Sequence, residues 1–251
     1  RCQQAGLVPA LSDLANMYWL KHVREVDPRL SAERFAHERM VAAVHDQHWV
    51  NRVPGWRSPE LVAADPLRCR LWFQRIEGRV MDWRDLTLIV DALLGAAPAF
   101  AAGRGTYVDD AASLARTLPE PARGRAQSWL SCSGRSSLVI NGDLHPQNIL
   151  AEEYGLAVVD WELGRFGHLA EEVSGLLLHA LRAAGRGAVC PSAADYIVAR
   201  TAHLAAPPTM WSLTALAATR LAALERSVGD TNRSDERVML AMLANDRVRT
   251  P

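Results

Sequence analysis

The chain has 251 residues, of which 49% are apolar, so it can bury the core of one two-lobed domain or of two small ones. Its 28 lysines and arginines balance its 28 aspartates and glutamates, and this neutrality favours neither nucleic acid nor a membrane surface as a partner. The four cysteines are scattered without a C-x-x-C spacing, which argues against a cysteine zinc site and against a disulfide framework.

We expect neither a secretory leader nor a membrane span in this sequence. It starts without a charged and then apolar segment, and its most apolar stretch, Leu86 to Ala102, is interrupted by Asp91 and Pro98. We therefore expect a globular protein in a reduced, cytoplasmic setting.

The first predicted strand, Met17 to Val23, is rich in aromatic and β-branched residues and carries Lys21 in its middle. Asp27-Pro28 ends this strand. Ser31 can then cap a helix that runs from about Ala32 to His45.

On that helix, Glu38 shares a face with Phe35 and Ala42, so its carboxylate turns toward the apolar side. A carboxylate in such a place needs a cation, and Lys21 is the natural one. The alternative is that Lys21 and Glu38 are unrelated charges that face water.

A second strand, Cys69 to Ile76, follows a loop and is closed by Glu77-Gly78. We expect Trp72 and Phe73 within it to be core residues. Apolar spacing then predicts a series of helices from Met81 onward, over Asp110 to Leu118, Ala122 to about Leu130, Val173 to Gly185, Ala193 to Leu204, Leu213 to Gly229, and from Ser234 onward. Pro207-Pro208 is expected to end the fifth of these.

Two short apolar runs in the middle of the chain, Ile149-Leu150 and Leu156 to Val159, are separated by turn residues and predict a β-hairpin. Antiparallel pairing would place Asn148, just before the first strand, beside Asp160, just after the second. Two oxygen-bearing side chains then meet at one end of the hairpin.

The polar loop that leads into this hairpin follows another short strand, Leu138 to Ile140, and contains Asp143 five positions before Asn148. Asp143 is a carboxylate that could accept a proton, while Asn148 and Asp160 offer the oxygen ligands that Mg²⁺ prefers. Phosphoryl transfer needs this combination, because a base must face the acceptor hydroxyl while a metal neutralises the transferred group.

The motif Gly142 to Leu150, followed by Val159 to Glu162, resembles the aminoglycoside phosphotransferase family, also called the choline/aminoglycoside kinase-like group. The resemblance implies an α+β, two-lobed protein-kinase-like fold. Its reduced, β-rich N-lobe would cover residues 1–78, and a mainly helical C-lobe with the catalytic hairpin would cover residues 79–251.

The resemblance also implies ATP and Mg²⁺ as cofactors, with Asp143 as the catalytic base, His145 in a supporting role, and Asn148 and Asp160 as metal ligands. Lys21, steadied by Glu38, would hold the nucleotide phosphates. The strand Cys69 to Ile76, closed by Glu77-Gly78, would be the hinge between the lobes, where backbone groups meet adenine.

Two positions depart from the family pattern. Asn141 stands where the family usually has histidine, and Glu172 stands where it usually has the aspartate that opens a helix. Both residues can still form structural hydrogen bonds. The first fifty residues contain a single glycine, Gly6, so either a glycine-rich phosphate loop is missing from this polypeptide or the loop Ser12 to Asn16 grips the nucleotide.

These features lead to two functional hypotheses. The first is an ATP-dependent phosphotransferase that acts on a hydroxyl of a small molecule or on Ser or Thr of a peptide. The peptide acceptor is suggested because the segments Tyr18 to Lys21 and Glu33 to Glu38 also resemble the kinase-like subunits of class V lanthipeptide synthetases. Such a subunit would work with a partner enzyme. The second is a catalytically impaired, kinase-like binding or regulatory subunit that recognises a peptide or protein.

Overall fold

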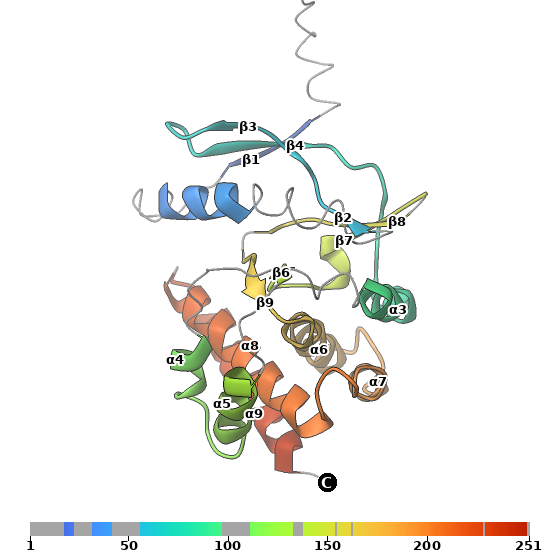
Figure 1. Cartoon of the computed structure of the whole chain (residues 1–251), viewed down its shortest axis with the longest axis vertical. Helices are drawn as coiled ribbons and strands as arrows, with labels where there is room; N and C mark the ends of the chain where they lie inside the picture. The colour runs from blue at the N-terminus through green and yellow to red at the C-terminus, as the bar shows by residue number, and fades with distance from the viewer. Residues whose placement is uncertain are drawn as a thin grey trace, which may run out of the picture.

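The computed structural model describes residues 18–22, 32–41, 56–96, 111–132, 138–153, 155–161, 163–227 and 229–249. Figure 1 shows two layers along the long axis of the molecule: strands and one short helix lie at one end, and packed helices fill the other. The expected α+β protein-kinase-like architecture, with a small β-rich part and a mainly helical part, is confirmed.

Nine strands are described, and they form three sheets. The strands are β1 (Tyr18–His22), β2 (Trp56–Arg57), β3 (Leu61–Asp65), β4 (Arg70–Gln74), β5 (Arg79–Val80), β6 (Leu138–Ile140), β7 (Ile149–Glu152), β8 (Gly155–Val158) and β9 (Arg165–Gly167). Their orders in the sheets are β1-β4-β3, β2-β8-β7-β5 and β6-β9.

The first sheet contains both strands predicted for the beginning of the chain. β1 and β3 flank β4, each antiparallel to it, and Lys21 is opposite Leu71. Residues 32–41 are helical and turn Phe35 onto Leu71, which forms a small core under this sheet. The predicted end of this helix at His45 lies outside the described residues.

The predicted hairpin is confirmed. β7 and β8 pair antiparallel with Ile149 opposite Val158, and the amide of Val159 donates to the carbonyl of Asn148 over 2.9 Å. The sequence did not predict its neighbours: β2 adds to β8 in parallel and β5 adds to β7, so the hairpin forms one sheet with strands from the first third of the chain.

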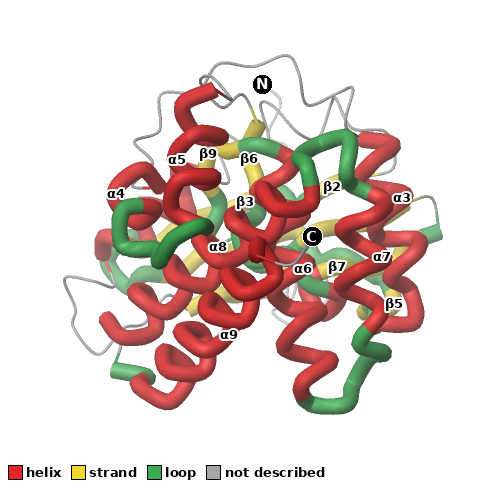
Figure 2. The backbone as a smooth tube through the Cα atoms, turned by 90° about the horizontal axis from the view of Figure 1, so that it is seen from below, coloured by secondary structure: helices red, strands yellow, loops and turns green. Residues whose placement is uncertain are grey.

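The described helices are α3 (Leu86–Ala96), α4 (Ala111–Ala115), α5 (Ala122–Cys132), α6 (Leu169–Gly185), α7 (Ser192–Arg200), α8 (Pro207–Ser227) and α9 (Thr231–Arg249), with short 3₁₀ turns at Trp83–Asp85 and Pro146–Asn148. Helix α6 is the most central, because its residues 169–180 are all buried. Figure 2 views the molecule from below, where α8 and α9 lie in front of the strands.

Several predicted helix boundaries were wrong; α6, for example, begins at Leu169, four residues before Val173. Helix α7 ends at Arg200, and Pro207 begins α8 instead of ending the previous helix, because the first turn of a helix does not need the amide proton that proline lacks. Helix α9 begins at Thr231, before Ser234. None of the described helices is long and apolar enough to cross a membrane.

Candidate active site

The loop between β6 and β7 is held by Asn141, whose side chain is fully buried. Its Nδ2 donates to the carbonyls of Asp160 (2.9 Å) and Val159 (3.3 Å), and its Oδ1 accepts from the amide of Asp143 (3.2 Å). Asn141 therefore ties the loop that carries Asp143 to the loop that carries Asp160, in agreement with its expected role as a structural hydrogen-bonder.

Glu172, near the start of α6, is hydrogen-bonded to the backbone of the same loop. Its carboxylate accepts from the amides of Asn141 (2.9 Å) and Gly142 (3.0 Å). Gly142 has a φ of +79°, and a Cβ there would lie 2.5 Å from the carbonyl oxygen of Leu163, so glycine is required. Burial raises the pKa of Glu172 to about 7 despite these two hydrogen bonds.

The neighbouring Glu171 has a different task. It forms an ion pair with Arg165 of β9 over 2.9 Å. Its carboxylate also accepts a hydrogen bond from the amide of His168, the residue just before α6. Glu172, rather than Glu171, thus bonds the backbone of the catalytic loop, as expected for a structural hydrogen-bonder.

Asp143 is hydrogen-bonded to a histidine that the sequence did not single out. His179 Nε2, from the middle of α6, lies 2.7 Å from Asp143 Oδ1. Burial would raise the pKa of Asp143, but the hydrogen bond and charge of His179 outweigh this effect and leave that pKa below its usual value. Asp143 is therefore ionised at neutral pH.

His145 lies beside the same pair. Its ring centroid is 4.6 Å from that of His179, and its Nδ1 donates to Gln147 Oε1 over 2.8 Å. Burial, together with the neighbouring His179, lowers the pKa of His145, which favours the neutral imidazole.

Asn148 and Asp160 sit at one end of the hairpin, as predicted. Asn148 is buried and its Nδ2 donates to the carbonyl of Asp143 over 3.2 Å. Asp160 adopts the left-handed region with a φ of +58°, a conformation that costs free energy in a non-glycine residue and that commonly marks a functional position.

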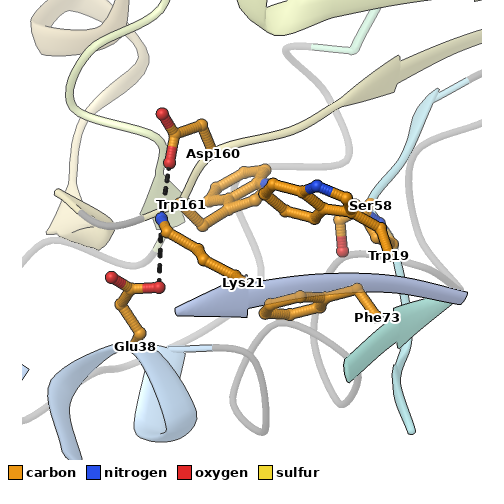
Figure 3. A pocket seen from close by; sticks show the side chains of 8 residues that line it. Trp19, Lys21, Glu38, Ser58, Phe73, Asp160 and Trp161 are labelled. Atoms are coloured by element: carbon orange, nitrogen blue, oxygen red, sulfur yellow. Dashed lines mark hydrogen bonds and ion pairs between the residues drawn. The ribbon is translucent and has the colours of Figure 1, made fainter. Parts of the chain in front are cut away.

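Lys21 joins this end of the hairpin to the first sheet. Its Nζ donates to Asp160 Oδ1 over 2.7 Å and lies 3.1 Å from Glu38 Oε2 (Figure 3). Glu38 is 4% exposed, and Arg34 lies on its other side at 3.6 Å. The predicted pairing of Lys21 with Glu38 is thus present, whereas the contact between Lys21 and Asp160 was not predicted.

Aromatic rings surround Lys21. Trp19, Phe73 and Trp161 line the same pocket, and the rings of Trp19 and Phe73 are 5.9 Å apart (Figure 3). Phe73 packs against the core of Phe35 and Leu71, as the sequence favoured, and its place opposite Trp19 on the neighbouring strand also brings it to the pocket wall. Trp161 is held by a bond from its Nε1 to the carbonyl of Val158.

A cavity of about 380 Å³ adjoins this pocket, with which it shares Trp19 and Pro59. Its other lining residues come from β1, from the end of β4 and the residues after it, and from the β7–β8 hairpin and the residue after it, namely Tyr18, Gln74, Arg75, Ile76, Leu150 and Val159. The segment after β4 is the one for which the sequence implied a hinge.

Sequence reasoning missed two residues of the site, His179 and Trp19. His179 stands seven positions after Glu172, so both lie on one face of α6, and this spacing was the available signal. Trp19 stands two positions before Lys21 and therefore shares its face of β1. The loop Ser12 to Asn16, proposed as a phosphate grip, and Glu162 lie outside the described residues.

Comparisons with known proteins agree with this geometry. Residues 91–210 match the model of the phosphotransferase enzyme family. Among solved structures, aminoglycoside phosphotransferase APH(4)-Ia superposes with a TM-score of 0.59 at 15% identity, over 84% of this chain and 82% of that one. Comparison with curated protein sequences gives no significant match.

Two further structures share the fold. A choline/ethanolamine kinase family protein from Mesorhizobium loti has a TM-score of 0.52 at 16% identity, covering 93% of this chain and 86% of its own. Aminoglycoside 2'-phosphotransferase-IIIa, solved as a GDP complex, has a TM-score of 0.57 at 12% identity, covering 92% and 87%. Residues 91–210 thus match the phosphotransferase enzyme family, and the chain has the protein-kinase-like fold of these aminoglycoside phosphotransferases and of the choline/ethanolamine kinase family protein.

Proposed function

We propose that this protein is an ATP-dependent phosphotransferase that moves the γ-phosphate to a hydroxyl group. The observation that carries the proposal is the meeting of Lys21 from β1 with Asp160 at the end of the catalytic hairpin. It brings a cation for phosphates and an oxygen ligand for a metal to one pocket. Asn148, at the same end of the hairpin as Asp160, is hydrogen-bonded to the backbone of the candidate base Asp143. In the protein-kinase-like class these are the parts of a phosphoryl-transfer site.

In this proposal, residues 1–78 form the nucleotide lobe and residues 79–251 the lobe of the acceptor. Lys21 would hold the α- and β-phosphates, with Glu38 keeping its ammonium in place. The cavity of about 380 Å³ next to Lys21 has the size of a small-molecule site and offers Trp19 as an aromatic surface for adenine.

Asn148 and Asp160 would hold Mg²⁺. The donor set fits, because an amide and a carboxylate supply the hard oxygen ligands that Mg²⁺ prefers. Asn148 donates its Nδ2 to a backbone carbonyl, so its Oδ1 is the atom that would face the cation. When bound, the cation would neutralise negative charge on the phosphates.

Asp143 would orient the acceptor hydroxyl and take its proton. Its carboxylate is ionised at neutral pH and is 25% exposed, so a substrate can reach it. The neutral His145 beside it would support the position of the transferred group, in agreement with its place two residues after the base.

The acceptor is a small molecule or a Ser or Thr of a peptide. A thermostable mutant of APH(4)-Ia has been solved in a ternary complex with ADP and hygromycin B, which supports a small-molecule acceptor for this fold. The peptide alternative, with a partner enzyme and a role in lanthipeptide formation, rests on the resemblance of the segments around Lys21 and Glu38. Either reaction would use cytoplasmic ATP.

A kinase-like binding subunit is the second candidate, favoured by the single glycine among the first fifty residues. Thermal unfolding with and without Mg²⁺-ATP separates the two functions, since a ligand that binds only the folded state raises its melting temperature. We expect Mg²⁺-ATP to stabilise the parent. The shift should shrink in Asp160→Ala and persist in Asp195→Ala, which alters an exposed ion pair with Arg247. No shift in the parent would contradict the phosphotransferase.

A further inference from the structure

We propose that Asp143, His145 and His179 form a binding site for a transition-metal ion of the Zn²⁺ type. One ligand atom from each of the three side chains can be chosen so that all lie within 4.8 Å of one another. The residues come from two elements, since Asp143 and His145 belong to the catalytic loop and His179 to α6.

The donor set distinguishes this site from the proposed Mg²⁺ site. Two imidazoles and one carboxylate with an open position are a common ligand set for catalytic Zn²⁺, whereas Mg²⁺ prefers oxygen ligands alone, such as Asn148 and Asp160. The ligand atoms of a tetrahedral Zn²⁺ ion lie roughly 3.3 Å apart, given bonds of about 2.0–2.1 Å. Distances of up to 4.8 Å between the ligand atoms would have to close by up to about 1.5 Å, which rotations of the Asp143 and His145 side chains would supply. The metal ion would also replace the proton in the hydrogen bond between His179 Nε2 and Asp143 Oδ1, and that proton would leave to solvent.

The surroundings already prepare His145 as a ligand. Its Nδ1 donates a proton to Gln147 Oε1 at 2.8 Å, so the neutral ring carries its lone pair on Nε2. Metal-bound histidines commonly donate their other ring nitrogen to such an oxygen, which fixes tautomer and orientation. Gln147 would thus be the outer partner of the site.

Burial gives the site one fixed side and one open side. His179 is 8% exposed and held within the central helix α6, while Asp143 is 25% exposed. His145 is also partly exposed, and its ring lies 4.6 Å from the ring of His179, tilted by 48° to it. An ion can therefore reach the partly exposed side chains of Asp143 and His145 from solvent and then bind the buried imidazole of His179.

Occupation of this site has a consequence that rests on the proposed function. A metal ion bound to Asp143 Oδ1 takes the oxygen that would receive the proton of the acceptor hydroxyl. Zn²⁺ should therefore inhibit phosphotransfer even with Mg²⁺ in excess, because the two cations use different residues.

Calorimetric titration of the full chain with Zn²⁺, in excess Mg²⁺, tests the binding directly. We expect one site in the parent whose affinity falls by more than about tenfold in His179→Gln and in His145→Gln, since loss of an outer partner alone typically costs about 10- to 100-fold. Gln147→Ala should weaken binding within that range. His203→Gln, which removes an exposed histidine away from the cluster, should bind like the parent.

Co²⁺ provides an independent signal, because its visible absorption reports a site with imidazole ligands and low coordination number. The band should appear in the parent and in His203→Gln and be lost in His179→Gln. The melting temperature of each variant, measured without metal, confirms that it folds.

Equal Zn²⁺ affinity in the parent and both histidine variants would overturn the proposal. So would binding that disappears when the exposed thiols are removed in Cys132→Ser with Cys190→Ser, because the cysteines would then be the ligands. Zn²⁺ binding with the expected histidine dependence, in a protein that transfers no phosphate, would sustain the metal site while contradicting the proposed function.

Discussion

Lys21 Nζ lies 2.7 Å from Asp160 Oδ1, although 139 residues separate the two in the chain. Lys21 is the only lysine in the sequence, and the remaining 27 of the 28 basic residues are arginines. A lysine presents a compact charge with three donors, whereas the planar guanidinium of arginine needs more room. The contact between β1 and the end of the hairpin is therefore made by the one lysine of the sequence.

This uniqueness allows a direct test of the nucleotide site. An amine-reactive acyl phosphate of ATP should modify Lys21, and excess Mg²⁺-ATP should protect it, as peptide mass spectrometry would show. In Lys21→Arg the modification should be absent and turnover should fall by about 10²- to 10³-fold, the usual loss when one stabilising donor is misplaced. Modification that Mg²⁺-ATP does not prevent would place the nucleotide elsewhere.

Asp143→Asn should separate chemistry from nucleotide binding. The amide cannot accept the hydroxyl proton, so turnover should fall by about 10²- to 10⁴-fold. The stabilisation by Mg²⁺-ATP should remain, because Lys21, Asn148 and Asp160 are unchanged. Steady-state kinetics and thermal unfolding measure the two effects. Asp195→Asn serves as the control, and a loss of nucleotide stabilisation in Asp143→Asn alone would show that Asp143 binds the nucleotide or its metal.

Glu172 should make the stability of the protein depend on pH. Its pKa is raised from 4.5 to about 7 in the folded state, so between these values the native protein binds a proton that the unfolded chain releases. The contribution is complete below about pH 4.5 and is lost as the pH rises through about 7. The free energy of unfolding should therefore fall by up to roughly 3 kcal/mol over this window.

Urea unfolding at about pH 5 and about pH 8 measures this loss. Glu172→Gln should lack most of the difference, since the amide does not titrate. Glu60→Gln, at an exposed position, should retain the full pH dependence of the parent. If the free energy of unfolding changes equally with pH in all three proteins, the pH dependence belongs to groups other than Glu172.

Asn141→Ala should destabilise the protein by about 1–3 kcal/mol, because the partly buried carbonyls of Val159 and Asp160 and the amide of Asp143 lose their partners. Chemical denaturation measures the change. Asn232→Ala, on the exposed side of α9, should change the free energy of unfolding by no more than about 0.5 kcal/mol. An equally small change in the free energy of unfolding for Asn141→Ala would mean that the loops of Asp143 and Asp160 keep their positions without the Asn141 hydrogen bonds.

The sequence alone determined the local parts of this site. The catalytic hairpin follows from two short apolar runs and a turn, so the placement of Asn148 near Asp160 needs only the pairing of neighbouring segments. The main helices follow from apolar spacing for the same reason, and the face that Glu38 shares with Phe35 indicated its need for a cation.

The tertiary structure alone decided which distant segments meet. The pairing of β2 with β8 and of β6 with β9 depends on packing between segments that no local pattern relates. His179 reaches Asp143 only because α6 passes beneath the catalytic loop, and an imidazole on a buried helix face could equally have been a core residue. The metal site proposed for these side chains is a product of that non-local contact.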